Sequence, residues 1–334
     1  MPTPLKAGIV LRERYKVRRI IGQGGMGSIY LADDLRLEGR LCALKEVEHD
    51  NSLPADMLRQ AREQFQREAT VLARLDHPNL PKVSDFFSER QREYLVMDYV
   101  PGKDLRTLMT EAKQRDNYLP ERDVLVWAAQ LADALDYLHS QEPPILHRDI
   151  KPSNLKLTPS GLIKLVDFGL VKILASEEMT LTILQGRGTA LYTPLEQYGG
   201  DTGHTEARSD IYAFGATLYH LLTNHPPVEA RERFLHPDSL LSPRQLNAEI
   251  SPRTERAILW AMNLHPDDRP PQVNAFRQVL LGDFTPSISS RRPPTRNSSS
   301  GAPLFPGLLS TPTDRALVGI AVGLLLMSLL ATLL

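Results

Sequence analysis

Eight consecutive residues, HRDIKPSN at 147–154, carry an imidazole, a guanidinium, a carboxylate, an ammonium and an amide. Such crowding of charge costs repulsion and desolvation unless a highly charged ligand lies beside it. Asp149 can accept a proton or orient a hydroxyl, and Lys151 can neutralise charge on a transferred phosphoryl group. The stretch therefore indicates chemistry on a polyphosphate.

A metal site is predicted next to this loop. The following residues favour two short strands, Leu155–Leu157 and Ile163–Val166, joined by the turn TPSG. A hairpin of this size brings Asn154 close to Asp167. Amide and carboxylate oxygens suit Mg²⁺, which takes few protein ligands and completes its shell with water and phosphate oxygens. The pair thus predicts a nucleotide–metal site.

A glycine-rich segment, GQGGMG at 22–27, fits the pattern G-x-G-x-x-G. A dinucleotide fold needs a helix directly after these glycines, whereas here the alternation of Ile29 and Leu31 predicts a strand. The other phosphate-binding loop fails because Ser28 stands where its lysine should be. The remaining interpretation is a strand–glycine–strand hairpin that lies over a triphosphate, since backbone without side chains can approach the anion closely.

Two charged residues are predicted to face inward in the first hundred residues. Lys45 alternates with apolar residues in RLCALKEVE, and a helix from about Pro54 to Leu75 places Glu68 on the face of Val71 and Leu72. One interpretation pairs the ammonium with the carboxylate. The other treats Glu68 as one more solvated charge on a polar helix, and periodicity leaves both open.

Composition bounds the function. The 334 residues are 42% hydrophobic and 24% charged with a formal net charge of -1, which suits a globular protein and disfavours a nucleic-acid binder. The single cysteine, Cys42, excludes an internal disulfide and fits a reducing compartment. The N-terminus shows no signal-peptide pattern. Strand patterns dominate up to about residue 100, and helical spacing dominates after it.

The C-terminal part has a different composition. Residues 282–315 are rich in Pro, Ser, Gly and Thr, which predicts a flexible linker. Residues 316–334 contain no charge and no proline, and as a helix of about 28 Å they would cross a hydrocarbon core of about 30 Å. Arginines precede this segment, so the positive-inside bias places the globular part in the cytoplasm. We expect a single-pass anchor in the cell membrane.

The order and spacing of these motifs resemble the eukaryotic-like serine/threonine protein kinases, including their bacterial members. The resemblance implies an α+β, bilobal protein-kinase-like fold with a small β-rich N-lobe containing one main helix and a larger helical C-lobe. We therefore expect the following divisions of the chain: an N-terminal extension 1–14, a kinase domain 15–281 made of an N-lobe 15–100 and a C-lobe 101–281, the linker 282–315 and the transmembrane helix 316–334.

The resemblance also implies roles for single residues. Asp149 would be the catalytic base, Lys151 a phosphate contact, Lys45 the phosphate anchor paired with Glu68, and Asn154 and Asp167 the metal ligands. The implied cofactors are ATP with Mg²⁺ or Mn²⁺. Met97 would be the gatekeeper, with backbone groups of Asp98 and Val100 at adenine and Asp104 near the ribose. The full set of nucleotide-binding residues is Ile21, Gly22, Gln23, Gly24, Gly25, Met26, Gly27, Ile29, Ala43, Lys45, Met97, Asp98, Val100 and Asp104.

Further matches concern support and regulation. Asp210 matches the aspartate that braces the catalytic loop, and Glu196 with Arg269 matches a structural ion pair. The sequence departs from the family pattern mildly, with PLE at 194–196 and Ala190 where proline is frequent. Arg148 would receive a phosphate on the activation loop, for which Thr180 and Thr182 are the candidate phosphosites.

The expected activity is transfer of the ATP γ-phosphoryl group to Ser or Thr hydroxyls of proteins, including the chain itself. Two alternatives are a pseudokinase-type scaffold and a small-molecule phosphotransferase of the same fold. The expected partners are protein substrates and the membrane through 316–334, and no nucleic acid. A G-x-x-x-G pattern at Gly319–Gly323 favours association of two spanning helices into a homodimer.

Overall fold

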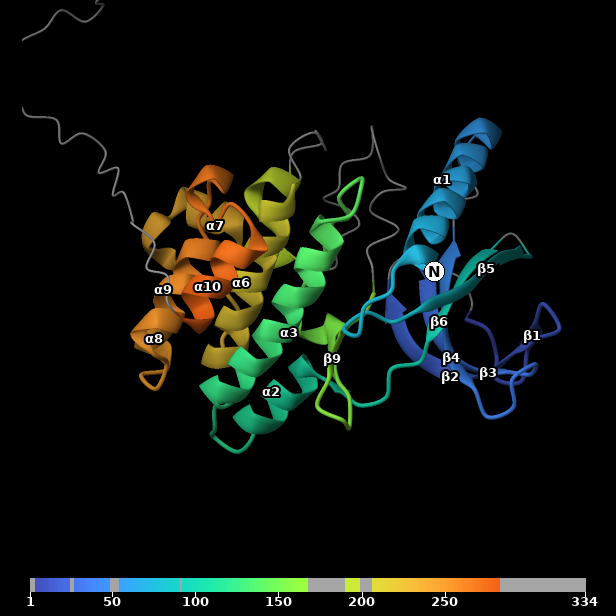
Figure 1. Cartoon of the computed structure of the whole chain (residues 1–334), viewed down its shortest axis with the longest axis horizontal. Coiled ribbons are helices and arrows are strands. Elements are labelled where there is room, and N and C mark those ends of the chain that lie inside the picture. Colours follow the sequence, from blue (N-terminus) through green and yellow to red (C-terminus); the bar gives the residue numbers. More distant parts are fainter. Residues whose placement is uncertain are drawn as a thin grey trace, which may run out of the picture. The chain divides into compact units, whose positions relative to one another are not determined.

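The computed structural model describes residues 4–24, 27–48, 54–90, 92–167, 190–198 and 206–282. These residues form a β-rich N-lobe followed by a mainly helical C-lobe (Figure 1), so the bilobal α+β architecture expected from the sequence is confirmed. Several predictions fall outside the described residues: Gly25, Met26, Thr180, Thr182, the linker beyond Gly282 and the segment 316–334.

The N-lobe is built on a six-stranded antiparallel sheet. Its strands lie in the order β1-β2-β3-β4-β6-β5. The bounds in chain order are β1 Val10–Leu11, β2 Tyr15–Gly24, β3 Gly27–Asp34, β4 Leu41–Glu48, β5 Val83–Glu89 and β6 Arg92–Asp98. The predicted strand–glycine–strand hairpin is β2 with β3, which pair as far as Gly24 and Gly27.

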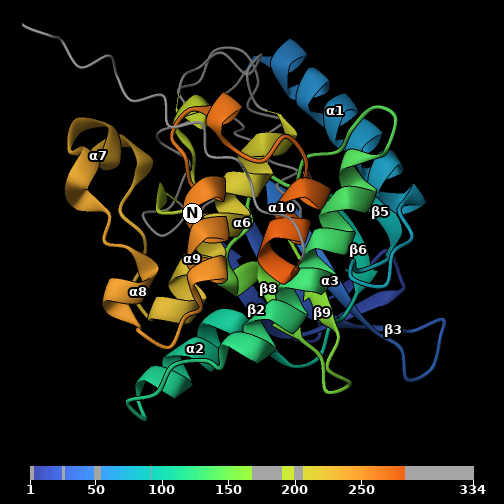
Figure 2. The ribbon, with the colours of Figure 1, turned by 60° about the vertical axis from the view of Figure 1, so that its left-hand side comes forward.

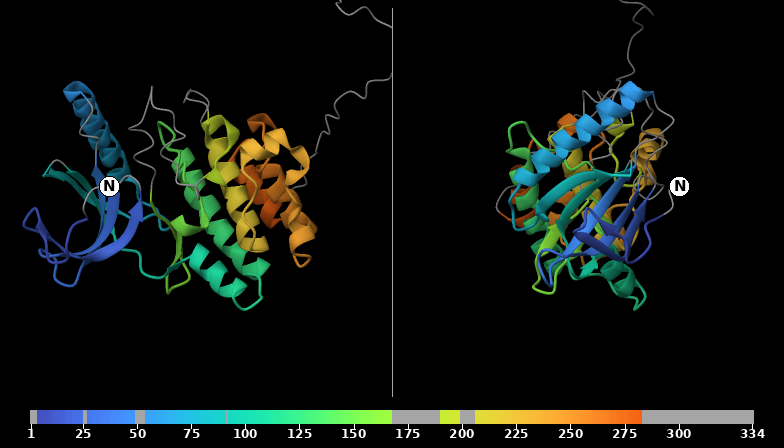
Figure 3. Two further views of the ribbon diagram at one scale, coloured as in Figure 1. Left: turned by 180° about the vertical axis from the view of Figure 1, so that it is seen from behind. Right: turned by 90° about the vertical axis from the view of Figure 1, so that its right-hand side faces the viewer.

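The two faces of this sheet carry different apolar clusters. Alternation along β4 sends Cys42 and Leu44 to an outer cluster, against which Leu5 of the N-terminal segment also packs. Ala43 belongs instead to the main core, which continues through α1 (Ala55–Arg74) into the C-lobe. Helix α1 packs against β5, and Figure 3 shows the sheet and this helix from behind and from the side.

Helix α6 (Ala207–Thr223) lies at the centre of the C-lobe and is buried along nearly its whole length (Figure 2). It packs against helices on several sides. At Gly215 a Cβ would lie only 2.7 Å from the Cβ of Ala261, so the close approach of α6 to α9 requires glycine there. The other helices are α2 Leu105–Lys113, α3 Glu121–His139, α7 Ala230–Leu235, α8 Pro243–Leu246, α9 Pro252–Ala261 and α10 Val273–Leu281, with the short 3₁₀ turns η1 Pro152–Asn154, η3 Leu195–Gln197, η5 Pro237–Ser239 and η6 Pro266–Asp268.

A second, three-stranded sheet carries the loop that bears the predicted catalytic residues. Its order is β7 (Lys103–Asp104), β8 (Leu155–Leu157) and β9 (Ile163–Leu165), all antiparallel. The hairpin predicted after HRDIKPSN is therefore confirmed, with β9 one residue shorter than expected. None of the helices in the described ranges is both long and apolar enough to cross a membrane.

Candidate active site

The predicted catalytic residues of the loop interlock through hydrogen bonds. Lys151 Nζ donates to both carboxylate oxygens of Asp149, at 2.9 and 3.1 Å. Asn154 Nδ2 donates to the Asp149 carboxylate at 2.9 Å and to its carbonyl at 2.8 Å. Pro152 starts the turn η1, which brings Asn154 back over Asp149. A base, a cation and an amide are thus held as one unit.

Asp210 on α6 braces this loop through hydrogen bonds from the loop's backbone. Its carboxylate accepts the backbone N–H groups of His147 and Arg148, both at 2.8 Å, and lies 2.9 Å from His139 Nε2. Burial opposes ionisation of Asp210, but the hydrogen bond and charge of His139, the charge of His147 and the backbone N–H of Arg148 outweigh it and hold the pKa of this carboxyl below its usual value. Arg148 adopts a positive φ of 64°, which these bonds maintain. The predicted bracing role of Asp210 is confirmed.

The two predicted metal ligands lie beside each other. Val166 N donates to the carbonyl of Asn154 at 2.8 Å, which places the next residue, Asp167, at the end of the same hairpin. Because the Asn154 amide donates through Nδ2, its Oδ1 oxygen is the atom that can ligate a metal. The donor set is one amide oxygen and one carboxylate, which suits Mg²⁺. In the described ranges no group of three or more His, Cys, Asp or Glu side chains could hold a metal.

The predicted pair of Lys45 with Glu68 is wrong for this structure. Lys45 Nζ instead makes a short ion pair with Asp167, from β4 across to the end of β9. Glu68 accepts a hydrogen bond from Gln64 Nε2 at 2.6 Å, one turn earlier on α1, while its Oε2 is buried and finds no donor in the described part of the chain. Burial raises the pKa of Glu68 to about 7, although Gln64 and the charge of Arg148 oppose this.

The inward orientation of Glu68 is nevertheless correct. Its side chain is only 8% exposed and shares its face with Phe65 and Leu72. Val71, which was expected on that face, is 39% exposed. The helix therefore buries Glu68, but in a position where the carboxylate does not reach Lys45.

Apolar members of the predicted nucleotide site come together in the main core. Ala43 pairs with Met97 across β4 and β6, and Ile21 and Ile29 pack against the same cluster. Lys45 pairs in register with Ile29 on one side. Four apolar side chains of the predicted nucleotide-binding set thus belong to, or pack against, one cluster.

Backbone geometry in this region requires glycine at one predicted position. Gly27 has a φ of +146°, and a Cβ there would lie 2.2 Å from the carbonyl oxygen of Glu46. Any side chain would force β3 away from β4 at the end of the glycine loop. Gly22, Gln23 and Gly24 lie opposite in β2.

The connection between the lobes shows how the predicted hinge residues are arranged. Asp98 N donates to the carbonyl of Lys82 at 2.9 Å, so its N–H is used inside the protein. Asp104 caps helix α2: its carboxylate accepts from Thr107 N at 2.9 Å and from Thr107 Oγ1 at 3.0 Å. Val100 is buried at 7% exposure. The capping bonds of Asp104 were not expected from the sequence.

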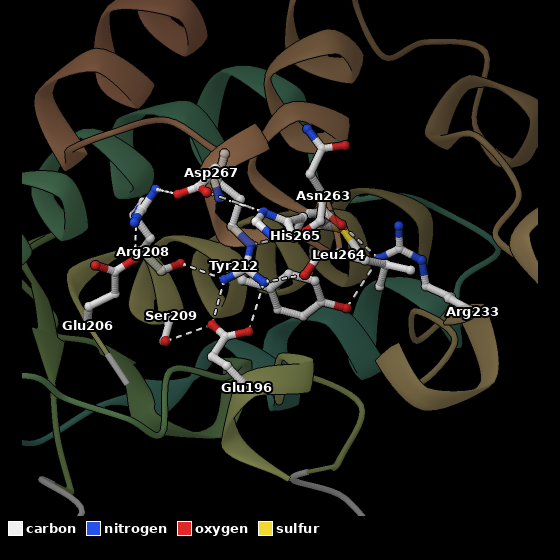
Figure 4. Close-up of polar contacts among 12 residues, drawn as sticks. Glu196, Glu206, Arg208, Ser209, Tyr212, Arg233, Asn263, Leu264, His265 and Asp267 are labelled. Carbon is white, nitrogen blue, oxygen red and sulfur yellow. Dashed lines mark hydrogen bonds and ion pairs between the residues drawn. The ribbon is translucent and has the colours of Figure 1, made fainter. Parts of the chain in front are cut away.

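The predicted structural ion pair between Glu196 and Arg269 is present. Arg269 donates to both carboxylate oxygens of Glu196 at 2.6 and 3.0 Å, and its side chain is 0% exposed. Ser209 Oγ also donates to Glu196, at 2.7 Å (Figure 4). These contacts hold η3, at the described end of the activation segment, on the start of α6.

His139 is the supporting residue that sequence reasoning missed. It ends α3 in the chain but lies on Asp210 in space. A histidine in the last turn of a helix is ordinary, since a cation there suits the helix dipole, so its position carried no specific signal.

Comparison with known proteins agrees with this geometry. Residues 15–280 match the family model of the protein kinase domain. A probable serine/threonine-protein kinase of Streptomyces coelicolor is 36% identical over 274 residues, covering 79% of this chain and 39% of that protein. The serine/threonine-protein kinase Pkn3 of Myxococcus xanthus is 33% identical, covering 90% of this chain and 55% of that protein.

The chain thus spans between about a third and about half the length of the curated relatives it matches. Among solved structures, the apo form of PpkA-294 superposes with a TM-score of 0.67 at 27% identity, covering 83% of this chain and 99% of that one. The family match covers most of the chain, and the interlocked loop, its aspartate brace and the buried ion pair lie within it: the chain belongs to the protein kinase family and resembles its bacterial serine/threonine kinases.

Proposed function

We propose that the chain is a serine/threonine protein kinase that transfers the γ-phosphoryl group of ATP to hydroxyls of protein substrates. The observation that carries this proposal is the interlocked set of Asp149, Lys151 and Asn154 beside Asp167. These four side chains supply a base, a cation and two metal ligands within one short stretch of structure. The named relatives are serine/threonine kinases, which supports the choice of substrate class.

Each residue has a defined task in the transfer. Asp149 orients the substrate hydroxyl and accepts its proton while the hydroxyl oxygen bonds to the γ-phosphorus and the bond from that phosphorus to the β–γ bridging oxygen breaks. Lys151 balances negative charge on the phosphoryl group in flight. Lys45 anchors the phosphates, and Gly27 keeps the covering loop close to them.

Asn154 and Asp167 would hold a divalent cation, for which we propose Mg²⁺. Such an ion would supply positive charge that neutralises the charge developing on the phosphate groups during transfer. The support is the ion pair between Lys45 and Asp167, in which the Asp167 carboxylate already accepts a positive charge. The remaining predicted nucleotide contacts, from Ile21 to Asp104, keep their proposed roles.

The test is phosphoryl transfer by the full chain with Mg²⁺ and labelled ATP, beside the variant Asp149→Asn. We expect phosphoserine or phosphothreonine on protein acceptors with the wild type, and a loss of at least about a hundredfold in the variant, as is typical when a general base is removed. Equal transfer by both proteins would reject Asp149 as the base. ATP binding without any transfer would reject the kinase activity.

A non-catalytic scaffold is the second candidate, because Glu68 lies away from Lys45 in this structure. The scaffold would bind partners and ATP through the same fold. The transfer assay separates the two, since a scaffold shows binding and no labelled product. Transfer to free metabolites and to no protein would favour a small-molecule phosphotransferase.

We also propose activation by phosphate on Thr180 or Thr182, paired with Arg148. The support is that Arg148 is held within the catalytic loop by the hydrogen bond from its backbone N–H to Asp210. A phosphate opposite an arginine forms charge-assisted hydrogen bonds that order a loop. Full activity of a chain in which both threonines are alanine would contradict this proposal.

Finally, we propose that residues 316–334 anchor the chain in the membrane, with the kinase domain at 15–281 on the cytoplasmic side and residues 282–315 as linker. The support is the run of 19 residues without charge or proline. Flotation of the full chain with lipid vesicles, compared with a chain that ends at Arg315, tests the anchor. Loss of self-association on Gly323→Leu would support dimerisation through that helix.

A further inference from the structure

A cluster of basic side chains lies where α2 and α6 meet the end of the activation segment. We call Arg106, Lys113, His220 and His225 the basic cluster. Arg106 and Lys113 are seven residues apart on α2, about two turns, so they lie near one face of that helix, and both are exposed. His220 comes from the last turn of α6, and His225 follows two residues after this helix ends.

The basic cluster adjoins the catalytic loop. Helix α2 packs on η1, the turn that ends with Asn154, and also on α6. One turn before His220 on α6, Thr217 Oγ1 donates to the carbonyl of Ile150 at 3.4 Å, next to Asp149. A substrate chain whose hydroxyl reaches Asp149 would therefore have neighbouring residues within reach of this cluster, since an extended chain advances about 3.3 Å per residue.

Tyr192 connects the cluster to the activation segment. Its hydroxyl lies 2.6 Å from His220 Nδ1, and the two rings stack with centroids 6.0 Å apart. Burial lowers the pKa of His220 to about 4, helped by the charges of Arg106, Lys113 and His225. His220 is therefore neutral near pH 7, and Arg106 and Lys113 supply the positive charge.

No carboxylate among the described residues forms an ion pair with Arg106 or Lys113. Arg106 forms no ion pair within the ranges that the structure describes, and Lys113 donates to a carbonyl, that of Asn224, at 3.1 Å. The acidic residues on the same stretch have other partners: Glu111 pairs with Lys103 at 2.6 Å, and Asp104 caps α2. Within the described part of the chain, Arg106 and Lys113 thus carry positive charge beside the catalytic loop that no paired carboxylate offsets.

We propose that the basic cluster selects protein substrates that carry an anionic side chain, a carboxylate or a phosphate, close to the acceptor Ser or Thr. This inference rests on the proposed kinase activity and names its substrate class. Arg106 is the main specificity-determining residue, because its guanidinium can bind either anion through two N–H groups. Lys113 adds charge at a second point.

The experiment compares matched peptides with one threonine acceptor and a single aspartate, phosphoserine, alanine or arginine, moved through the five positions on each side. The full chain is assayed for kcat/KM. We expect aspartate and phosphoserine to exceed arginine by about fivefold at one or two positions, the size of a surface charge contact, with the difference shrinking at high salt. Arg106→Glu should reverse the order at those positions.

The matched control is Arg256→Glu, an exposed arginine on α9, which should keep the wild-type order. If wild type treats aspartate and arginine peptides alike, or if Arg106→Glu leaves their ratio unchanged, the proposal is wrong. If the alanine peptide is still phosphorylated in either case, the proposed kinase activity stands and only the proposed substrate preference is rejected. Anisotropy of the same labelled peptides reports their binding without turnover, so the proposal is tested even if transfer fails.

Discussion

Two buried carboxylates, one in each lobe, show how differently the lobes hold their functional residues. Asp210 in the C-lobe is 1% exposed and accepts from two loop amides, with His139 at its side. Glu68 in the N-lobe is 8% exposed and, among the residues that the structure describes, has Gln64 as its one donor. The pKa of Asp210 is below its usual value, whereas burial raises that of Glu68 to about 7.

The difference shows which part of the site is held in place by hydrogen bonds within the protein. A buried carboxylate surrounded by donors fixes whatever supplies those donors, and for Asp210 that is the catalytic loop. A buried carboxylate with an unsatisfied oxygen would gain stability from an additional donor, and this is the condition of Glu68. The C-lobe therefore fixes the loop that carries Asp149 through Asp210, whereas Glu68 in the N-lobe fixes no comparable loop.

The largest effect should follow from Asp210→Ala. Three donors lose their acceptor, and at about 1–3 kcal/mol for each unsatisfied buried group the free energy of unfolding should fall by several kcal/mol. Phosphoryl transfer should be lost with the loop geometry. Urea unfolding with a transfer assay measures both. A stable, active variant would show that Asp210 does not brace the loop.

Arg269→Met should rank second. It leaves the buried Glu196 carboxylate with Ser209 as its donor, and breaking a buried pair in this way costs about 3–5 kcal/mol. The free energy of unfolding is again the measurement. Adding Glu196→Gln should recover part of the loss, and a double variant that is less stable than the single one would contradict the pairing.

His139→Phe should have a smaller effect, because Asp210 keeps its two backbone donors. Loss of one hydrogen bond to a charged acceptor is expected to cost about 2 kcal/mol. His139→Gln retains a donor and serves as the control in the same unfolding measurement. Equal stability of the Phe variant and the wild type would remove His139 from the brace.

The smallest and most pH-dependent effect is expected from Glu68→Gln. The folded-state pKa of Glu68, about 7, lies above its ordinary value of 4.5. Its contribution to the free energy of unfolding is therefore fully present below about pH 4.5 and is lost as the pH rises through 7. The variant should therefore gain stability relative to the wild type from pH 5 to pH 8. Glu63→Gln, an exposed change on the same helix, should show no such trend. A flat difference for Glu68→Gln would indicate that its carboxyl is not the buried, unsatisfied group described.

Local patterns in the sequence determined most of the architecture. Alternation and glycine spacing predicted β2 and β3, helical periodicity predicted α1 and a mainly helical second lobe, and the turn TPSG predicted the β8–β9 hairpin that brings Asn154 beside Asp167. These features depend on contacts between near neighbours in the chain, which a sequence displays directly.

Only the tertiary structure decided the partners of buried charges. Periodicity placed Glu68 inward, yet whether its carboxylate reaches Lys45 depends on where α1 lies over the sheet, and Lys45 lies on Asp167 instead. In the same way, His139 contacts Asp210, 71 residues later in the chain. Arg106 lies near His220, 114 residues later. A side chain's type shows that it needs a partner, but helix packing over such separations selects which one it finds.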